Sequence, residues 1–274
     1  MKQRLITAAV AIPVILTFIW VGTLPFFIIV SAVLMIAQYE FYSIVGTSQL
    51  SPQKAICLPA GFLILAAAYL RSPDMLMSTQ KGIPAFVLTL SLGLLIIGHL
   101  FSKNIRYFIE SMGVSLMGIF MIPWLGSYFI LLRDIAPYGK EYFYMLIVGV
   151  WVVDTAAYAA GTKYGIKKLA KTISPKKTVI GAIAGVIAGV AFAFLWNAAY
   201  AEIKFLNYID LIVMGLIVGI AGQIGDLAES MVKRAGLVKD SGNMFPGHGG
   251  AYDRIDSLLP AAALLYYYIV IFVR

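Results

Sequence analysis

The chain has 274 residues, of which 61% are hydrophobic and 12% are charged, and its mean hydropathy is +0.89. Soluble domains carry about 25% charged residues, so this composition excludes a soluble globular protein and predicts an integral membrane protein. The net charge of +8 comes without interleaved basic and aromatic residues, and we expect no nucleic-acid partner. The single cysteine, Cys57, is expected to be a small apolar core residue.

Continuous apolar runs follow one another along the whole chain. They lack the alternation of barrel strands and predict an all-α, polytopic bundle of about nine transmembrane helices. The N-terminus resembles a signal peptide, but no convincing cleavage site follows, so we interpret it as the first span. The predicted spans are residues 5–21, 24–45, 55–70, 83–101, 112–132, 141–160, 178–198, 208–232 and 255–273.

Basic residues are distributed unevenly between the two predicted sides of the membrane. Nine spans place fifteen cations on one side and six on the other. The positive-inside rule then predicts a multi-pass protein of the inner membrane with a cytoplasmic N-terminus, and the same cations attract anionic membrane lipids. We divide the chain into N-terminal transmembrane helices, 1–110, and a C-terminal transmembrane region, 111–274, with cytoplasmic loops 161–177 and 233–254, which carries the candidate catalytic residues described below.

Glycines recur at every fourth position in two of the spans: Gly181, Gly185 and Gly189, then Gly215 and Gly219. Small residues at this spacing let helix backbones approach closely. We therefore expect tight packing of these helices, either within one protomer or across a homodimer.

Charged residues first enter an apolar run near the end of the eighth span. Asp226, Glu229, Ser230 and Lys233 follow the helical spacing i, i+3, i+4, i+7 and share one stripe. A carboxylate inside a membrane costs about 3 kcal/mol, so two on one face need a partner. Either Lys233 neutralises them in an internal salt bridge, or they line a polar cavity of the C-terminal half that opens to the cytoplasm and holds a metal.

A polar, glycine-rich stretch precedes the last span, with the sequence KDSGNMFPGHGGAYDRIDS. Gly247, Gly249 and Gly250 surround His248, and their missing side chains would let backbone N–H groups approach an anion. Asp253 and Asp256 lie three residues apart where the last helix is expected to start. An acidic first turn suits the helix dipole, so capping explains one of them without any ligand.

A third polar block lies between the sixth and seventh spans. We interpret Ser174 as an N-cap and Pro175 as the first residue of the seventh helix, with Lys176 and Lys177 in its first turn. Two lysines at a helix N-terminus are unfavourable unless an anion binds there. The block therefore indicates a phosphate site, although cytoplasmic loops are rich in lysine in any case.

The segment from Ser230 to Ser257 resembles the signature of the phosphatidate cytidylyltransferases, also called CDP-diacylglycerol synthases. The matching positions have fixed spacing, and the resemblance extends over about residues 150–260, whereas residues 1–110 match only as generic spans. This sequence has Val179-Ile180 where the family often has Trp-Glu, Phe245 where leucine is common, and Ala251 where a bulkier aliphatic residue is usual. The matching residues are Ser230, Lys233, Arg234, Lys239, Asp240, Pro246, Gly247, His248, Gly249, Gly250, Asp253, Arg254 and Asp256.

The resemblance implies that CTP and phosphatidate react to give CDP-diacylglycerol and pyrophosphate, with Mg²⁺ as cofactor and room for a second metal ion. Asp226 and Asp253 would bind metal, with Glu229 or Asp256 assisting. The resemblance assigns catalytic roles to Asp226, Lys233, Arg234, Asp253 and Arg254. Binding of the substrate phosphates falls on Ser174, Lys176, Lys177, Ser230, Lys239, Asp240, Gly247, His248, Gly249 and Gly250. We favour His248 as a phosphate donor or loop brace over a general acid, because pyrophosphate already leaves readily.

Two other functions stay open at this point. A CTP-dependent polyprenol kinase would use a similar membrane fold, but would transfer the γ-phosphoryl group to a lipid hydroxyl. A membrane transporter would explain the intramembrane carboxylates as an ion path, although the two halves of the sequence show no inverted repeat.

Overall fold

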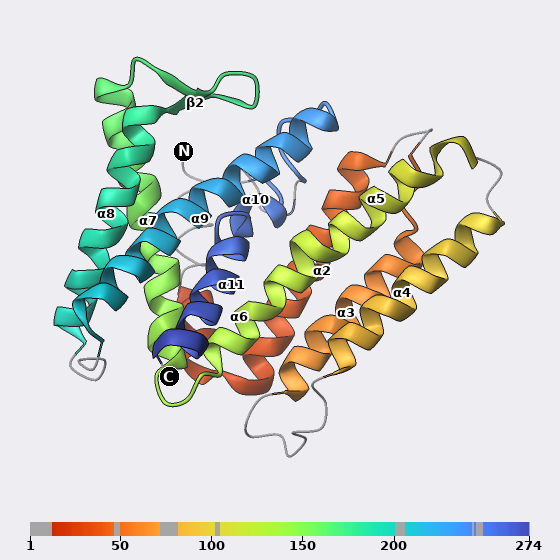
Figure 1. The fold of residues 1–274 in the computed structure, drawn as a ribbon, viewed down its shortest axis with the longest axis horizontal. Helices are drawn as coiled ribbons and strands as arrows, with labels where there is room; N and C mark the ends of the chain where they lie inside the picture. The colour runs from red at the N-terminus through yellow and green to blue at the C-terminus, as the bar shows by residue number, and fades with distance from the viewer. Residues whose placement is uncertain are drawn as a thin grey trace. The chain divides into compact units, whose positions relative to one another are not determined.

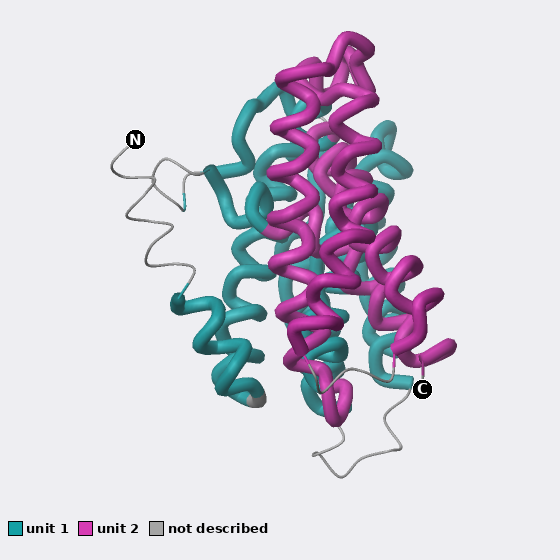
Figure 2. Tube along the Cα trace, turned by 90° about the vertical axis from the view of Figure 1, so that its left-hand side faces the viewer, with its two compact units in different colours: residues 1–134, 232–254 teal, residues 135–231, 255–274 magenta. Residues whose placement is uncertain are grey.

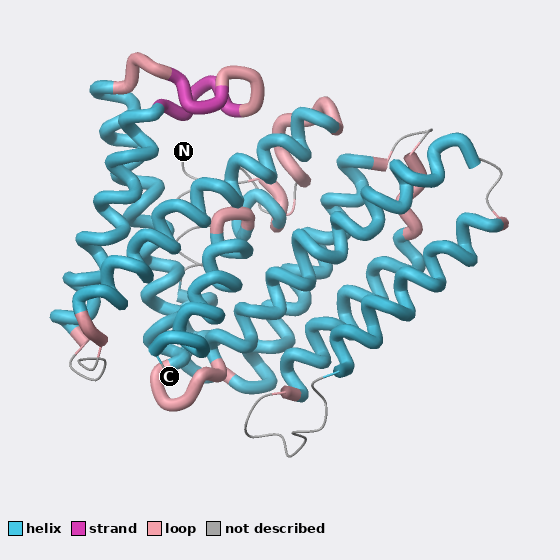
Figure 3. Tube along the Cα trace, in the orientation of Figure 1, coloured by secondary structure: helices cyan, strands magenta, loops and turns pink. Residues whose placement is uncertain are grey.

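The computed structural model describes residues 13–46, 50–71, 82–101, 105–200, 206–242, 244 and 249–273. Most of these residues are helical, and seven helices among them are long and apolar enough to cross a membrane (Figures 1 and 3). The all-α, polytopic membrane fold is thereby confirmed. The elements are α2 (Thr23–Val45), α3 (Lys54–Leu70), α4 (Ile83–Leu100), η2 (Ile105–Tyr107), α5 (Phe108–Ile119), η3 (Phe120–Trp124), α6 (Leu125–Arg133), α7 (Gly139–Tyr164), β1 (Lys168–Ala170), β2 (Ser174–Thr178), α8 (Val179–Ala199), α9 (Tyr208–Ala235), α10 (Tyr252–Ile255), α11 (Leu258–Tyr268) and η5 (Ile269–Val273).

The predicted spans from the second to the ninth each coincide with helix. The 112–132 span belongs to one apolar run, Ile105–Arg133, in which the π-helical η3 joins α5 to α6 at Pro123. Helix α3 has 17 residues and is shorter than each of the seven membrane-length helices. Residues 5–12 of the first predicted span lie outside the described residues, and its remaining part, 13–21, is helix. The number of nine spans stays a prediction.

The chain forms two compact units, coloured separately in Figure 2. Unit 1 contains Met1–Asp134 and Val232–Arg254, and unit 2 contains Ile135–Met231 and Ile255–Arg274. Helix α9 thus runs from unit 2 into unit 1. The predicted boundary at residue 110 separates N-terminal helices from the region with the candidate site, whereas the two units are defined by compactness alone. The predicted boundary stays a prediction.

Buried polar side chains connect the helices of unit 1. Gln38 on α2 donates through Nε2 to the carbonyl of Cys57 at 3.0 Å, and Tyr42 donates to the carbonyl of Ser115 at 2.7 Å. A Cβ at Gly118 would lie 2.5 Å from the Tyr42 ring. Glycine at this position therefore allows α5 to approach α2 closely.

Glycines bring α8 against both of its neighbours in unit 2. A Cβ at Gly181 would lie 2.6 Å from the carbonyl oxygen of Ala157 on α7, and a Cβ at Gly189 would lie 2.9 Å from that of Gly215 on α9. Backbones can pass this closely only where side chains are missing. The predicted tight packing is confirmed within the chain, and the homodimer stays a prediction.

The predicted start of the seventh helix is wrong. Residues Ser174–Thr178 form strand β2, which pairs antiparallel with β1 in a two-stranded hairpin. Helix α8 begins at Val179, and the N-cap is Thr178, which has extended backbone angles and accepts the N–H of Gly181 at 3.1 Å. Ser174 and Thr178 both suit an N-cap. Pairing with β1 supplies hydrogen-bond partners for the backbone of the residues before Thr178, so these residues do not join the helix. At the junction, Val179 N–H donates to Lys167 O at 2.9 Å.

Candidate active site

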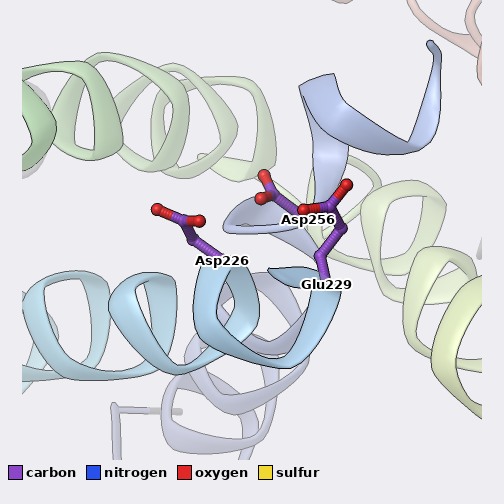
Figure 4. Close-up of side chains that lie close together, drawn as sticks. All are labelled: Asp226, Glu229 and Asp256. Atoms are coloured by element: carbon purple, nitrogen blue, oxygen red, sulfur yellow. The ribbon is translucent and has the colours of Figure 1, made fainter. Parts of the chain in front are cut away.

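Three carboxylates gather in unit 2. Asp226 and Glu229 lie one turn apart on α9, and Asp256 precedes α11 (Figure 4). Each offers an oxygen atom within 4.8 Å of the others. Glu229 is 1% exposed, whereas the side chain of Asp226 is about one-third exposed. The arrangement combines two acidic residues from one helix with a third from a segment that follows it in the chain.

Gly225 explains why Asp256 can reach the other two carboxylates. A Cβ at this position would lie 2.2 Å from the carbonyl oxygen of Asp256 and 2.8 Å from the ring of Pro260. No ordinary side chain fits there without moving the backbone. The missing side chain therefore lets the start of α11 rest against α9 beside Asp226 and Glu229.

Lys177 forms an ion pair with one carboxylate of this group. Lys177 Nζ lies 2.5 Å from Asp226 Oδ2, and its side chain is 24% exposed. Lys177 comes from β2, where neighbouring side chains point to opposite faces, and Lys176 is accordingly exposed. Asp154 on α7 also interacts electrostatically with both Asp226 and Lys177. Clustered carboxylates of this kind suit a hard divalent cation, which binds oxygen ligands.

Asp253 belongs to unit 1, and the group of three does not include it. Its Oδ1 accepts from Lys233 Nζ at 2.6 Å. Its Oδ2 accepts at 2.9 Å from the N–H groups of Ser241 and Gly250, and the hydroxyl of Ser241 lies at the same distance. These contacts favour a role in bracing the polar loop. The assignment of Asp253 as a metal ligand stays a prediction.

Gly249 lies close against the carboxylate of Asp253. Its φ is +85°, in the left-handed region, and a Cβ there would lie 2.5 Å from Asp253 Oδ2. Both the backbone conformation and the close approach therefore require glycine. Gly249 and Gly250 thus lie against an anion, which is the protein's own Asp253.

The remaining predicted site residues are distributed over both units. Ser174 and Ser230 are half-buried, on β2 and α9 respectively. Exposed residues are Lys176, Arg234, Lys239, Asp240 and Arg254. Gly247 and His248 lie outside the described residues, so their predicted role in binding phosphate stays a prediction.

The sequence reasoning missed one acidic residue, Glu40 on α2. Glu40 is 8% exposed and contacts Ser241, Ala251 and Tyr252 in unit 1. A carboxylate within an apolar span is a functional signal in its own right. No second charged residue accompanies it at helical spacing, so the pattern that marks Asp226 and Glu229 is missing here.

Comparisons with known proteins agree on one family. The chain matches the Cytidylyltransferase family over residues 2–272. It is 33% identical to a phosphatidate cytidylyltransferase of Bacillus subtilis, over 99% of this chain and 98% of the relative. It is 34% identical to the protein of that name in Brucella suis, over 99% and 94% of the two chains, and 29% identical to the one in Synechocystis, over 98% and 96%.

Proposed function

The chain belongs to the cytidylyltransferase family, and we propose that it transfers the cytidylyl group of CTP to phosphatidate. The products are CDP-diacylglycerol and pyrophosphate. Relatives named phosphatidate cytidylyltransferase align with it over nearly the full length of both chains, which supports the choice of substrates. The comparisons do not favour a polyprenol kinase or a transporter.

One observation carries the chemical part of the proposal: the group of Asp226, Glu229 and Asp256 beside Lys177. Three carboxylates with oxygens within 4.8 Å repel one another, and Lys177 forms an ion pair with one of them, Asp226. Carboxylate oxygens are also the donors that Mg²⁺ prefers. We therefore propose these three residues as the Mg²⁺ ligands. When bound, the ion would neutralise charge on the CTP phosphates and on the departing pyrophosphate.

The reaction needs little proton chemistry from the protein. A phosphate oxygen of phosphatidate forms a bond to the α-phosphorus of CTP, the bond between that phosphorus and the bridging α,β oxygen breaks, and pyrophosphate leaves with the electron pair. The attacking oxygen is already ionised near neutral pH, because the second pKa of a phosphate monoester is about 6. The protein's main task is to bring two polyanions together and orient them.

Lysines and arginines would perform that task. Lys177 already lies against Asp226 and is placed to bind a phosphate oxygen once CTP enters. Lys176 and Arg254 are exposed and would bind further phosphate oxygens. Lys233 contacts Asp253, and that ion pair would fix the ammonium group in one position.

We further propose that the reaction takes place at the cytoplasmic face of the inner membrane. The apolar helices support a multi-pass membrane protein. The positive-inside rule supports a cytoplasmic position for the loops that carry most of the basic residues. CTP is a soluble nucleotide, whereas phosphatidate remains in the bilayer, so a site at this surface is accessible to both substrates.

The test is a balance of products with purified protein in lipid-detergent micelles. With CTP, Mg²⁺ and phosphatidate, we expect pyrophosphate and CDP-diacylglycerol in equal amounts. With a polyprenol as the lipid, we expect neither product and no CDP. Release of CDP with a polyprenol, or no reaction with phosphatidate from folded protein, would refute the proposal.

A further inference from the structure

Glu40 is a buried carboxylate in an apolar helix of unit 1. It lies on α2 within the apolar stretch Leu24–Val45 and is 8% exposed. Burying an ionised carboxylate is costly unless hydrogen bonds satisfy its oxygen atoms. The partners of Glu40 therefore indicate why the chain keeps a charge at this position.

Three donors from the polar loop meet this carboxylate. The N–H of Ala251 donates to Oε1 at 3.1 Å, and the N–H of Tyr252 donates to Oε2 at 3.0 Å. The hydroxyl of Ser241 also lies 2.9 Å from Oε2. Hydrogen bonds to a charged acceptor are stronger than those between neutral groups. Both ends of the segment 241–252 are thus held by one side chain of the N-terminal region.

Two glycines are required for this contact. A Cβ at Gly242 would lie 2.3 Å from Glu40 Oε1, and a Cβ at Gly250 would lie 2.3 Å from Oε2. The backbone can approach the carboxylate this closely only because both residues lack a side chain. Gly242 and Gly250 therefore contribute to the contact with Glu40 through the absence of a side chain.

The contacts continue from Glu40 to charged residues of the predicted site. Ser241 Oγ lies 2.9 Å from both Glu40 Oε2 and Asp253 Oδ2. A hydroxyl donates one hydrogen, so Ser241 bonds to one carboxylate at a time and holds the two close together. Asp253 in turn accepts from Lys233 Nζ at 2.6 Å. A shift of Glu40 would therefore move Ser241, Asp253 and Lys233.

We propose that Glu40 is a positioning residue for cytidylyl transfer. Its carboxylate holds Ser241 and the Gly250–Tyr252 backbone in the conformation that places the Asp253–Lys233 pair. The inference rests on the proposed function for its kinetic consequence, whereas the anchoring itself can be measured without turnover. The N-terminal helices then contribute to the site as well as to the membrane anchor.

The first test compares Glu40→Gln with Glu110→Gln, a control on the exposed glutamate at the start of α5 in the same unit. Glutamine keeps the shape but loses the charge. We expect Glu40→Gln to lower kcat about tenfold to a hundredfold, the scale for a misplaced catalytic group. Hydrogen exchange should become faster in the peptide that spans 249–254 and stay unchanged in α3 and α4. The control should match the unsubstituted protein in both measurements.

The second test uses the fit between Glu40 and Gly242. Gly242→Ala alone should lower kcat, because its methyl group displaces the carboxylate. Glu40→Asp shortens that side chain, so the double variant should lose less activity than the product of the two single effects. Independent effects would overturn the proposed fit.

Two results would overturn the proposal as a whole. One is a kcat for Glu40→Gln within threefold of the control with unchanged exchange at 249–254. The other is faster exchange throughout unit 1, which would indicate a general structural role. If the unsubstituted protein transferred no cytidylyl group, the proposed function would fail, while the exchange comparison would still decide whether Glu40 anchors the loop.

Discussion

Asp226→Asn removes one charge from the group of three carboxylates. We expect it to lower the activity while the protein still folds. Because the oxygens lie within 4.8 Å of one another, each carboxylate pair costs at least about 3.5 kcal/mol at an effective dielectric constant of 20, and the substitution relieves at least about 7 kcal/mol of repulsion. It also removes the attraction to Lys177 Nζ at 2.5 Å, which is about 7 kcal/mol on the same scale. The two terms cancel to within a few kcal/mol, and we expect the variant to fold.

Its activity should behave differently. Loss of one ligand charge should lower kcat by about a hundredfold or more and raise the Mg²⁺ concentration needed for half-maximal rate. The assay follows the incorporation of CTP labelled at the α-phosphorus into lipid over a Mg²⁺ titration, with Glu110→Gln as control and thermal unfolding as a check of folding. Near-normal turnover of Asp226→Asn at an unchanged Mg²⁺ requirement would refute the metal assignment.

Three further substitutions test the surroundings of the same group. Lys177→Met should lower activity about tenfold or more and raise KM for CTP, whereas Lys176→Met should cost less; equal effects in steady-state kinetics would contradict the special position of Lys177. Gly225→Ala should lower both activity and the unfolding temperature, because its methyl group displaces Asp256, and a variant with normal values of both would contradict this packing. Thr178→Val should lower the free energy of unfolding by about 1 kcal/mol through loss of the cap, and an unchanged unfolding transition would argue against that role.

Local sequence rules predicted the membrane helices and part of the site. Length and hydropathy located the spans, and the i, i+3 spacing placed Asp226 and Glu229 on one side of α9. The same reasoning failed for Ser174, because both Ser174 and Thr178 suit an N-cap. Only the pairing of β2 with β1, a contact between segments, decides between them.

Contacts between distant segments explain what the sequence could not predict. Asp256 joins Asp226 because Gly225 lets the start of α11 approach α9, and spacing along one helix says nothing about that approach. Glu40 meets Ser241 across 201 positions of the chain. The sequence analysis did not single out Glu40, and nothing in the sequence pairs it with Ser241.

The most direct test of the central claim follows the two ends of the CTP phosphate chain. Purified protein is supplied with Mg²⁺, phosphatidate or a polyprenol, and CTP labelled at either the α- or the γ-phosphorus. We predict that the α label enters the lipid phase only with phosphatidate, that the γ label leaves as pyrophosphate, and that Asp226→Asn suppresses both. Entry of the γ label into a polyprenol, or no movement of either label with folded protein, would contradict the assignment.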